Sequence, residues 1–195
     1  MKPWYVTATA ILVGLTMHCA HPLDGSENEP ITEGPQGRTY TNQSLGFQIT
    51  IPTPLDTSWG MSVQTFHHTG FLADGTTLSV YITGPRGRAE FQPTLSLLPF
   101  PVGRGTTLSD LATQAVNDFK ASYTNYREAA HQTATVGNVP AVQWTFTTRN
   151  QGGADRYTVT LLTNGNLGYL MQGSGIEGYY PLDDYARILK TFKLF

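Results

Sequence analysis

The clearest strand in this sequence of 195 residues is Leu45-Gly46-Phe47-Gln48-Ile49-Thr50-Ile51-Pro52. Phe47, Ile49 and Ile51 alternate with polar residues, which predicts a strand with one buried face. Gly46 opens the strand after a polar turn, and Pro52 closes it because proline has no N–H to donate to a ladder. We therefore expect the rest of the chain to pack around the apolar side of this strand.

Length and composition favour one strand-rich domain. Hydrophobic residues make up 39% of the chain, enough for a single core, while only 13% of residues are charged and the net charge is −2. Residues 38–195 carry 11 Lys and Arg against 10 Asp and Glu, so the basic surface of a nucleic-acid-binding protein is missing. We expect no nucleic-acid partner. The single cysteine, Cys19, cannot form a disulfide within the chain, so the core alone must stabilise the domain.

The N-terminal segment has the composition of an export signal. Residues 1–15 carry one positive charge, Lys2, and then an apolar run that is too short for a stable transmembrane span. Cys19 follows, and residues 20–37 are rich in Pro, Gly, Glu, Asn and Ser, which is typical of a solvated tether. This order resembles a bacterial lipoprotein. We expect a signal peptide, a lipidated cysteine with its tether, and one folded domain over residues 1–18, 19–37 and 38–195, respectively.

The residues around the cysteine leave two other interpretations open. Lipoprotein signals have Leu three places before the cysteine and a small residue directly before it, whereas this chain has Thr16 and His18 there. Cleavage by an ordinary signal peptidase needs a small-x-small site, and His18-Cys19-Ala20 is a poor one. A retained, uncleaved anchor is the other alternative. Lipidation alone explains the position of the single cysteine, so we expect palmitate-type chains on Cys19 to hold the protein at a membrane, on its periplasmic or cell-surface side.

Several short strands are expected downstream. Apolar alternation and hairpin turns predict strands over residues 38–41, 64–68, 77–82, 130–136, 139–149, 156–163 and 167–172. Residues 90–100 are expected to be extended, with Pro93, Pro99 and Pro101 keeping this segment at the edge of a sheet.

Two helices complete the pattern. Apolar residues at helical spacing predict a long helix over residues 108–125, with Thr107 as its N-cap and Asp110 three residues on. A second helix is predicted over residues 181–192. The fold class is therefore α+β, with a mostly antiparallel sheet flanked by helices in an α/β/α sandwich.

Several motifs resemble the Mog1/PsbP-like superfamily, which includes bacterial proteins of the DcrB type. They are Tyr40 with Leu45-Gly46-Phe47-x-Ile49-x-Ile51-Pro52, then Trp59, Gly137-x-x-Pro140-Ala141, Gly168-Tyr169 and Ile188-Leu189-Lys190-Thr191-Phe192. The resemblance spans residues 38–195. It implies a binding or accessory protein without a cofactor rather than an enzyme.

The chain contains no convincing motif for catalysis, a cofactor or a metal. Gly173-Ser174-Gly175-Ile176-Glu177-Gly178 fits G-x-G-x-x-G, but only 17 residues follow it, too few for the second strand of a dinucleotide fold. We expect a flexible link from strand to helix there. His67 and His68 are adjacent in a predicted strand, so they point to opposite faces and cannot both bind one ion. Asp183 and Asp184 suit the start of a helix.

The remaining candidates are contact residues. Arg86, Arg88 and Arg104 lie in Gly- and Pro-rich loops, where they could form an anion or partner site, and Trp59 could form an apolar contact. We expect a membrane-anchored, non-enzymatic lipoprotein that acts through protein contacts at the cell envelope. The alternative is a small-ligand carrier or small hydrolase with a pocket between the sheet and the long helix.

Overall fold

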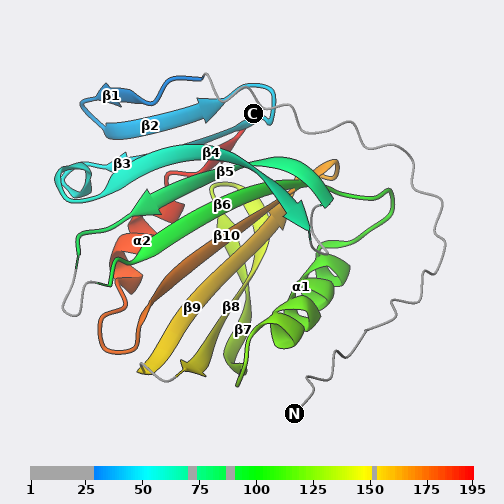
Figure 1. Ribbon diagram of the computed structural model, residues 1–195. Coiled ribbons are helices and arrows are strands. Elements are labelled where there is room, and N and C mark those ends of the chain that lie inside the picture. The colour runs from blue at the N-terminus through cyan, green and yellow to red at the C-terminus, as the bar shows by residue number, and fades with distance from the viewer. Residues whose placement is uncertain (1–28, 70–73, 87–90, 151–152) are drawn as a thin grey trace, which may run out of the picture.

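The computed structural model describes residues 29–69, 74–86, 91–150 and 153–195. These residues form two antiparallel sheets and two α-helices (Figure 1). The predicted signal peptide, Cys19 and Arg88 lie outside the described residues.

The larger sheet has seven strands in the order β4-β5-β6-β10-β9-β8-β7. Its strands are β4 (Gly60–Thr69), β5 (Asp74–Thr83), β6 (Thr94–Pro101), β7 (Arg127–Val136), β8 (Val139–Asn150), β9 (Gly153–Thr163) and β10 (Leu167–Ile176). All neighbouring pairs are antiparallel. Each strand expected after residue 60 lies inside one of these longer strands, and Gly137 and Gly165 make the predicted hairpin turns with positive φ.

The smaller sheet has four strands in the order β1-β2-β3-β11. They are β1 (Thr32–Gly34), β2 (Gly37–Asn42), β3 (Phe47–Pro52) and β11 (Lys193–Leu194). Strand β3 is the strand predicted first from the sequence, and its apolar residues are fully buried.

The tether prediction is wrong for residues 29–37. Thr32 pairs with Thr39, and the backbone N–H of Gln43 donates to the Glu29 carboxylate at 3.0 Å, so these residues belong to the folded domain. All three residues of β1 are exposed, so no apolar alternation revealed this edge strand.

One face of the large sheet, the small sheet and α2 (Leu182–Leu189) enclose a hydrophobic cluster, which we call the β3 cluster. Its fully buried aromatic members are Tyr40, Phe47, Tyr169, Tyr185 and Phe192. The Phe47 ring lies 5.9 Å from Tyr169 and 6.0 Å from Phe192, between centroids. Strand β3 thus meets both the middle of the large sheet and the C-terminal segment.

The opposite face of the large sheet packs on α1 (Leu108–Ser122) in a second cluster, which we call the α1 cluster. It contains Leu111, Ala115 and Phe119 of the helix and Trp144, Phe146, Val159 and Leu161 of the sheet. Leu161 and Leu162 belong to different clusters because successive residues in a strand face opposite sides. The α+β fold with helices on both sides of the sheet is therefore confirmed (Figure 1).

Helix α1 begins as predicted. The Thr107 hydroxyl oxygen accepts from the Asp110 N–H at 3.2 Å, and the Asp110 carboxylate accepts from the Thr107 N–H at 3.0 Å, which makes a capping box. Helix α2 ends at Leu189, three residues before the predicted end, because the chain turns there into β11.

The prediction that prolines keep residues 90–100 at an edge is wrong. Strand β6 pairs with β10 along its whole length, and with β5 from Thr94 to Leu97. Beyond Leu97 the ladder with β5 stops, and the Thr77 hydroxyl donates to the Pro99 carbonyl oxygen at 3.1 Å. Pro99 lies where β6 has no ladder with β5, so its missing N–H interrupts no rung there, and the Thr77 hydroxyl satisfies its carbonyl oxygen.

Candidate functional site: two hollows that share Lys193

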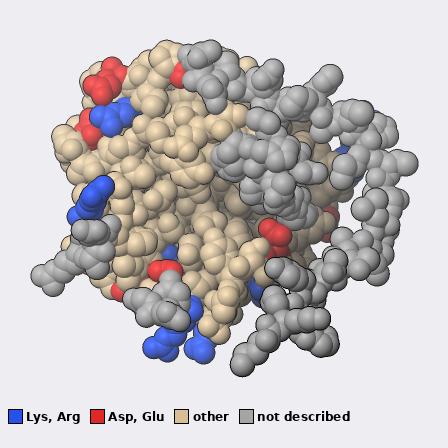
Figure 2. Space-filling view, in the orientation of Figure 1, with Lys and Arg blue, Asp and Glu red and all other residues tan. Residues whose placement is uncertain are grey.

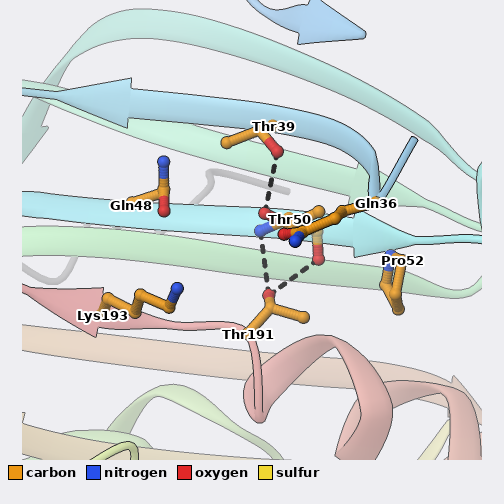
Figure 3. Close-up of a pocket in the computed structure, with 7 residues that line it drawn as sticks. All are labelled: Gln36, Thr39, Gln48, Thr50, Pro52, Thr191 and Lys193. Atoms are coloured by element: carbon orange, nitrogen blue, oxygen red, sulfur yellow. Dashed lines mark hydrogen bonds between the residues drawn. The ribbon is translucent and has the colours of Figure 1, made fainter. Parts of the chain in front are cut away.

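Thr191 completes the free side of β3 where β11 is too short to reach. The Thr50 N–H donates to the Thr191 hydroxyl oxygen at 2.9 Å, and that hydroxyl lies 2.8 Å from the Thr50 carbonyl oxygen (Figure 3). The Thr191 hydroxyl thus hydrogen-bonds both the backbone N–H and the backbone C=O of Thr50. On the other side, the hydroxyls of Thr39 and Thr50 are hydrogen-bonded at 2.9 Å.

These three threonines form the floor of the first hollow, which has a volume of about 280 Å³. Gln36, Gln48, Pro52 and Lys193 complete its lining (Figure 3). The hollow therefore offers hydroxyl groups, two side-chain amides and one ammonium group.

The second hollow, of about 320 Å³, lies between β11 and the β7–β8 hairpin. It is lined by Val136, Gly137, Asn138, Val139, Lys190, Phe192, Lys193 and Leu194. Lys193 belongs to both hollows, and Lys190 adds a second positive charge to this one.

Lys190 and Lys193 are exposed, and neither forms an ion pair with any residue that the structure describes. Among the residues that the structure describes, no carboxylate, imidazole or thiol lines either hollow, so these described linings offer no general base or nucleophile pair. Within the described ranges, no group of three or more His, Cys, Asp or Glu side chains could hold a metal ion. What this surface can do is hydrogen-bond a polar group and attract a negative one.

The prediction of Trp59 as a partner contact is wrong. Its side chain is only 2% exposed and meets the Tyr185 ring edge-to-face at 5.7 Å between centroids. Gly84 packs so closely that an added Cβ would lie 3.0 Å from the indole. Trp59 is therefore a core residue of the β3 cluster.

Arg86 and Arg104 are both exposed, but they do not form one site. Arg86 precedes β6 and Arg104 follows it, and a strand of eight residues is roughly 25 Å long. Lys and Arg are scattered over the face that Figure 2 shows. The prediction of a joint site therefore fails for this pair, and Arg88 lies outside the described residues.

The glycine-rich segment is not a flexible link. Gly173 and Gly175 lie in β10, where added Cβ atoms would come within 2.9 Å of the Tyr185 ring and 2.8 Å of the Tyr180 ring. These glycines make room for tyrosine side chains. Burial raises the pKa of Tyr180 to about 12, so its hydroxyl stays protonated near neutral pH.

The other sequence candidates add no site. His67 and His68 lie in β4, and their side chains are outside what the structure describes. Asp183 and Asp184 stand in the first turn of α2, as predicted. The sequence interpretation missed Lys190 and Lys193 because it placed residues 188–192 inside a helix and expected no strand after it.

Comparisons with solved structures bear on the fold. Cyanobacterial PsbP from Synechocystis superposes with a TM-score of 0.58 at 12% identity, over 93% of this chain and 100% of that one. This chain has a Mog1/PsbP-like fold. LpqN of Mycobacterium tuberculosis, described as involved in cell envelope biogenesis, superposes with a TM-score of 0.52 at 11% identity, over 76% of this chain and 82% of that one.

A crystal structure from Bacteroides thetaiotaomicron superposes with a TM-score of 0.52 at 10% identity and covers 82% of this chain. The match covers 49% of that chain, so the present chain corresponds to about half of it. No protein-family model and no curated protein matches the sequence. In the described part of the Mog1/PsbP-like chain, neither helix is long and apolar enough to cross a membrane.

Proposed function

We propose that this protein is an exported, lipid-anchored accessory protein of the cell envelope that binds another protein and catalyses no reaction. The N-terminal pattern around Cys19 supports anchoring on the periplasmic or cell-surface side. The shared fold with LpqN and with PsbP supports an accessory role. Fold alone does not give function, so the proposal depends on the site.

The observation that carries the proposal is the chemistry of the two hollows. Their linings combine hydroxyls, amides and the ammonium groups of Lys190 and Lys193, which form no ion pair with a described residue. Charge of one sign and hydrogen-bonding groups suit the rim of a protein interface. The partner that fits is a protein segment with carboxylates opposite the two lysines.

The alternative was a ligand pocket between the sheet and the long helix. In the structure, large side chains fill that interface: the Phe119 ring lies 5.4 Å from Phe146 and 6.1 Å from Trp144, between centroids. Leu111, Ala115 and Val116 are buried beside them. This packing favours docking at the surface over a carrier or hydrolase pocket there.

Cross-linking in native membranes tests the docking surface. The full-length protein with Lys190→Glu and Lys193→Glu should lose its cross-linked partner, because two favourable charge contacts become repulsive. The matched control is Arg86→Glu with Arg104→Glu, which makes the same change in net charge away from the hollows. Loss of the partner in both variants, or in neither, contradicts the proposal.

Fractionation tests the anchor separately. Cys19→Ser should move the protein out of the membrane fraction or leave an unprocessed precursor, because the acceptor for the lipid is gone. Mass spectrometry of the mature wild-type protein should show an acylated N-terminal Cys19. A mature protein that begins at any other residue overturns the lipid anchor but leaves the docking surface to be judged by the cross-linking.

A further inference from the structure

The two edges of the large sheet differ in how they are protected. Strand β4 forms one edge, and its ten residues, Gly60–Thr69, include no Lys, Arg, Asp, Glu or Pro. An edge strand presents unpaired N–H and C=O groups, and proteins usually block such edges with charge, proline or a bulge. Strand β4 has neither a charged residue nor a proline, and its pairing with β5 is regular throughout, without a bulge.

Strand β7, at the other edge, carries the expected protection. It contains Arg127 and Glu128, and its register shifts between Glu128 and Ala130. The Glu128 carboxylate lies 3.9 Å from the Lys120 ammonium and 3.6 Å from a ring nitrogen of His131. Charge and a bulge thus discourage pairing at this edge.

The outer edge of the small sheet is protected as well. Strand β1 has only three residues, and Glu33 forms an ion pair with Arg38 at 3.2 Å. Of the four edge strands β1, β11, β4 and β7, only β4 is both long and uncharged.

The side chains of β4 also indicate an edge that could pair with a further strand. Met61 and Val63 are half-buried at the rim of the β3 cluster, while Ser62 and Gln64 are exposed on the other face. Thr65 lies on the same side as Met61 and Val63, and its hydroxyl oxygen is enclosed without a hydrogen-bond partner among the described atoms. Met61 and Val63 are only half covered, so a further strand beside β4 would bury more of their apolar surface.

We propose that two copies of this chain pair through β4, antiparallel about a two-fold axis at Thr65. A two-fold axis here places each residue opposite one on the same face, so the face of one strand that carries Met61 and Val63 continues into the same face of the other. The strand carries no formal charge at neutral pH with histidine neutral, so self-pairing meets no like-charge repulsion.

The position of the axis follows from the length of the strand. An axis at Thr65 pairs residues 61–69 with their counterparts, whereas an axis at Val63 pairs only residues 60–66, because β4 begins at Gly60. The longer ladder gives about eight backbone hydrogen bonds across the interface. It also sets the two Thr65 residues directly opposite each other. The two large sheets then form one continuous sheet.

The first test is the mass of the full-length protein in detergent, measured by sedimentation at micromolar concentration. We expect a dimer for the wild type. Gln64→Lys should weaken association about tenfold or more, because the axis brings the two introduced lysines close together. The matched control is Gln132→Lys on the β7 edge, which is also exposed and should leave the dimer intact. A monomeric wild type, or equal weakening by both variants, overturns the proposal.

The second test determines which residues of the two β4 strands lie opposite each other. Thr65→Cys should give a covalent dimer with a short thiol cross-linker or on oxidation, in the lipidated protein whose Cys19 is already modified. Gln132→Cys should not cross-link under the same conditions. A dimer that is linked through Gln132→Cys but not through Thr65→Cys overturns pairing through β4. Capture of a foreign extended segment on β4 in place of a second copy overturns it too.

Discussion

The two hydrophobic clusters are assembled differently. The β3 cluster joins segments far apart in sequence: Thr50 and Thr191, whose hydrogen bonds close it, are separated by 141 positions. The α1 cluster is built from a helix, strand β6 directly before it and strands that follow it within a few dozen residues. Long-range closure costs more loop entropy, so the β3 cluster needs a larger gain from packing.

Polar groups are accommodated inside the β3 cluster by specific hydrogen bonds. The Asn42 amide donates to the Tyr40 hydroxyl oxygen at 3.0 Å and accepts from the Leu45 N–H at 2.8 Å. The Tyr169 hydroxyl donates to the Leu45 carbonyl oxygen at 2.7 Å, and burial raises the pKa of Tyr169 to about 12. The α1 cluster instead gathers aromatic rings, some at its exposed border. The β3 cluster is therefore the less tolerant of substitution.

Substitution of one phenylalanine in each cluster measures that difference. Phe47→Ala should lower the free energy of unfolding by about 4 to 5 kcal/mol, and Phe119→Ala by about 3 kcal/mol. Phe47 is fully buried among three aromatic rings, whereas Phe119 is 9% exposed and its site can relax toward solvent. Urea unfolding gives both values. An equal or larger loss for Phe119→Ala would remove the distinction between the clusters.

Substitution of Thr191, which closes the β3 cluster, should have a smaller effect on the free energy of unfolding. Thr191→Val keeps the shape of the side chain but leaves the Thr50 N–H without its acceptor, which should cost about 1 to 2 kcal/mol. Thr39→Val removes only a hydrogen bond between two hydroxyls and should cost less. Urea unfolding of the two variants side by side gives the comparison. If Thr39→Val is the more damaging, Thr191 does not close the ladder as described.

The N-terminal cap of α1 involves only residues that are close in sequence, so its loss should have a smaller effect on stability. Thr107→Ala should lower stability by about 1 kcal/mol, because it removes the acceptor for the Asp110 N–H. Thr113→Ala is the control: the Thr113 hydroxyl donates back to Ser109 within the helix, so its loss should be neutral or slightly stabilising. Thermal unfolding by circular dichroism distinguishes the two. Equal destabilisation would show that the capping box contributes nothing particular.

The smallest expected effect depends on pH. Hydrogen bonds from Thr107 hold the pKa of Asp110 below its ordinary value of 3.8. A carboxyl with a lowered folded-state pKa stabilises the protein above its unfolded pKa, and that contribution disappears as pH falls through the folded pKa. Stability between pH 5 and 2, taken as about the acid range of aspartate, should therefore fall more steeply in the wild type than in Asp110→Ala. Parallel profiles would contradict the assignment.

The sequence predicted most of the fold because local signals agreed with the tertiary structure. Phe47, Ile49 and Ile51 alternate and are buried, and Thr107 with Asp110 predicted the start of α1. Strands β1 and β11 were missed for opposite reasons. Strand β1 has no apolar residue, and β11 has only two residues whose pairing depends on β3 being in place.

The site was harder to predict than the fold. The expectation for Trp59 failed because an aromatic residue in a loop gives no sign of whether it is buried or exposed. The first hollow combines Gln36 and Thr39 with Thr191 and Lys193, which only the small sheet brings together. No local pattern records such a long-range arrangement, although the polar residues that alternate along β2 and β3 mark the face on which the first hollow lies.

The bonds between Thr191 and Thr50 also affect the order of events during synthesis. A ribosome makes β3 long before it makes residues 188–194, so one edge of β3 stays unpaired in the nascent chain until those residues follow. The β3 cluster cannot close while most of the chain is being translated. The fold is therefore completed only when the last residues of the chain have left the ribosome.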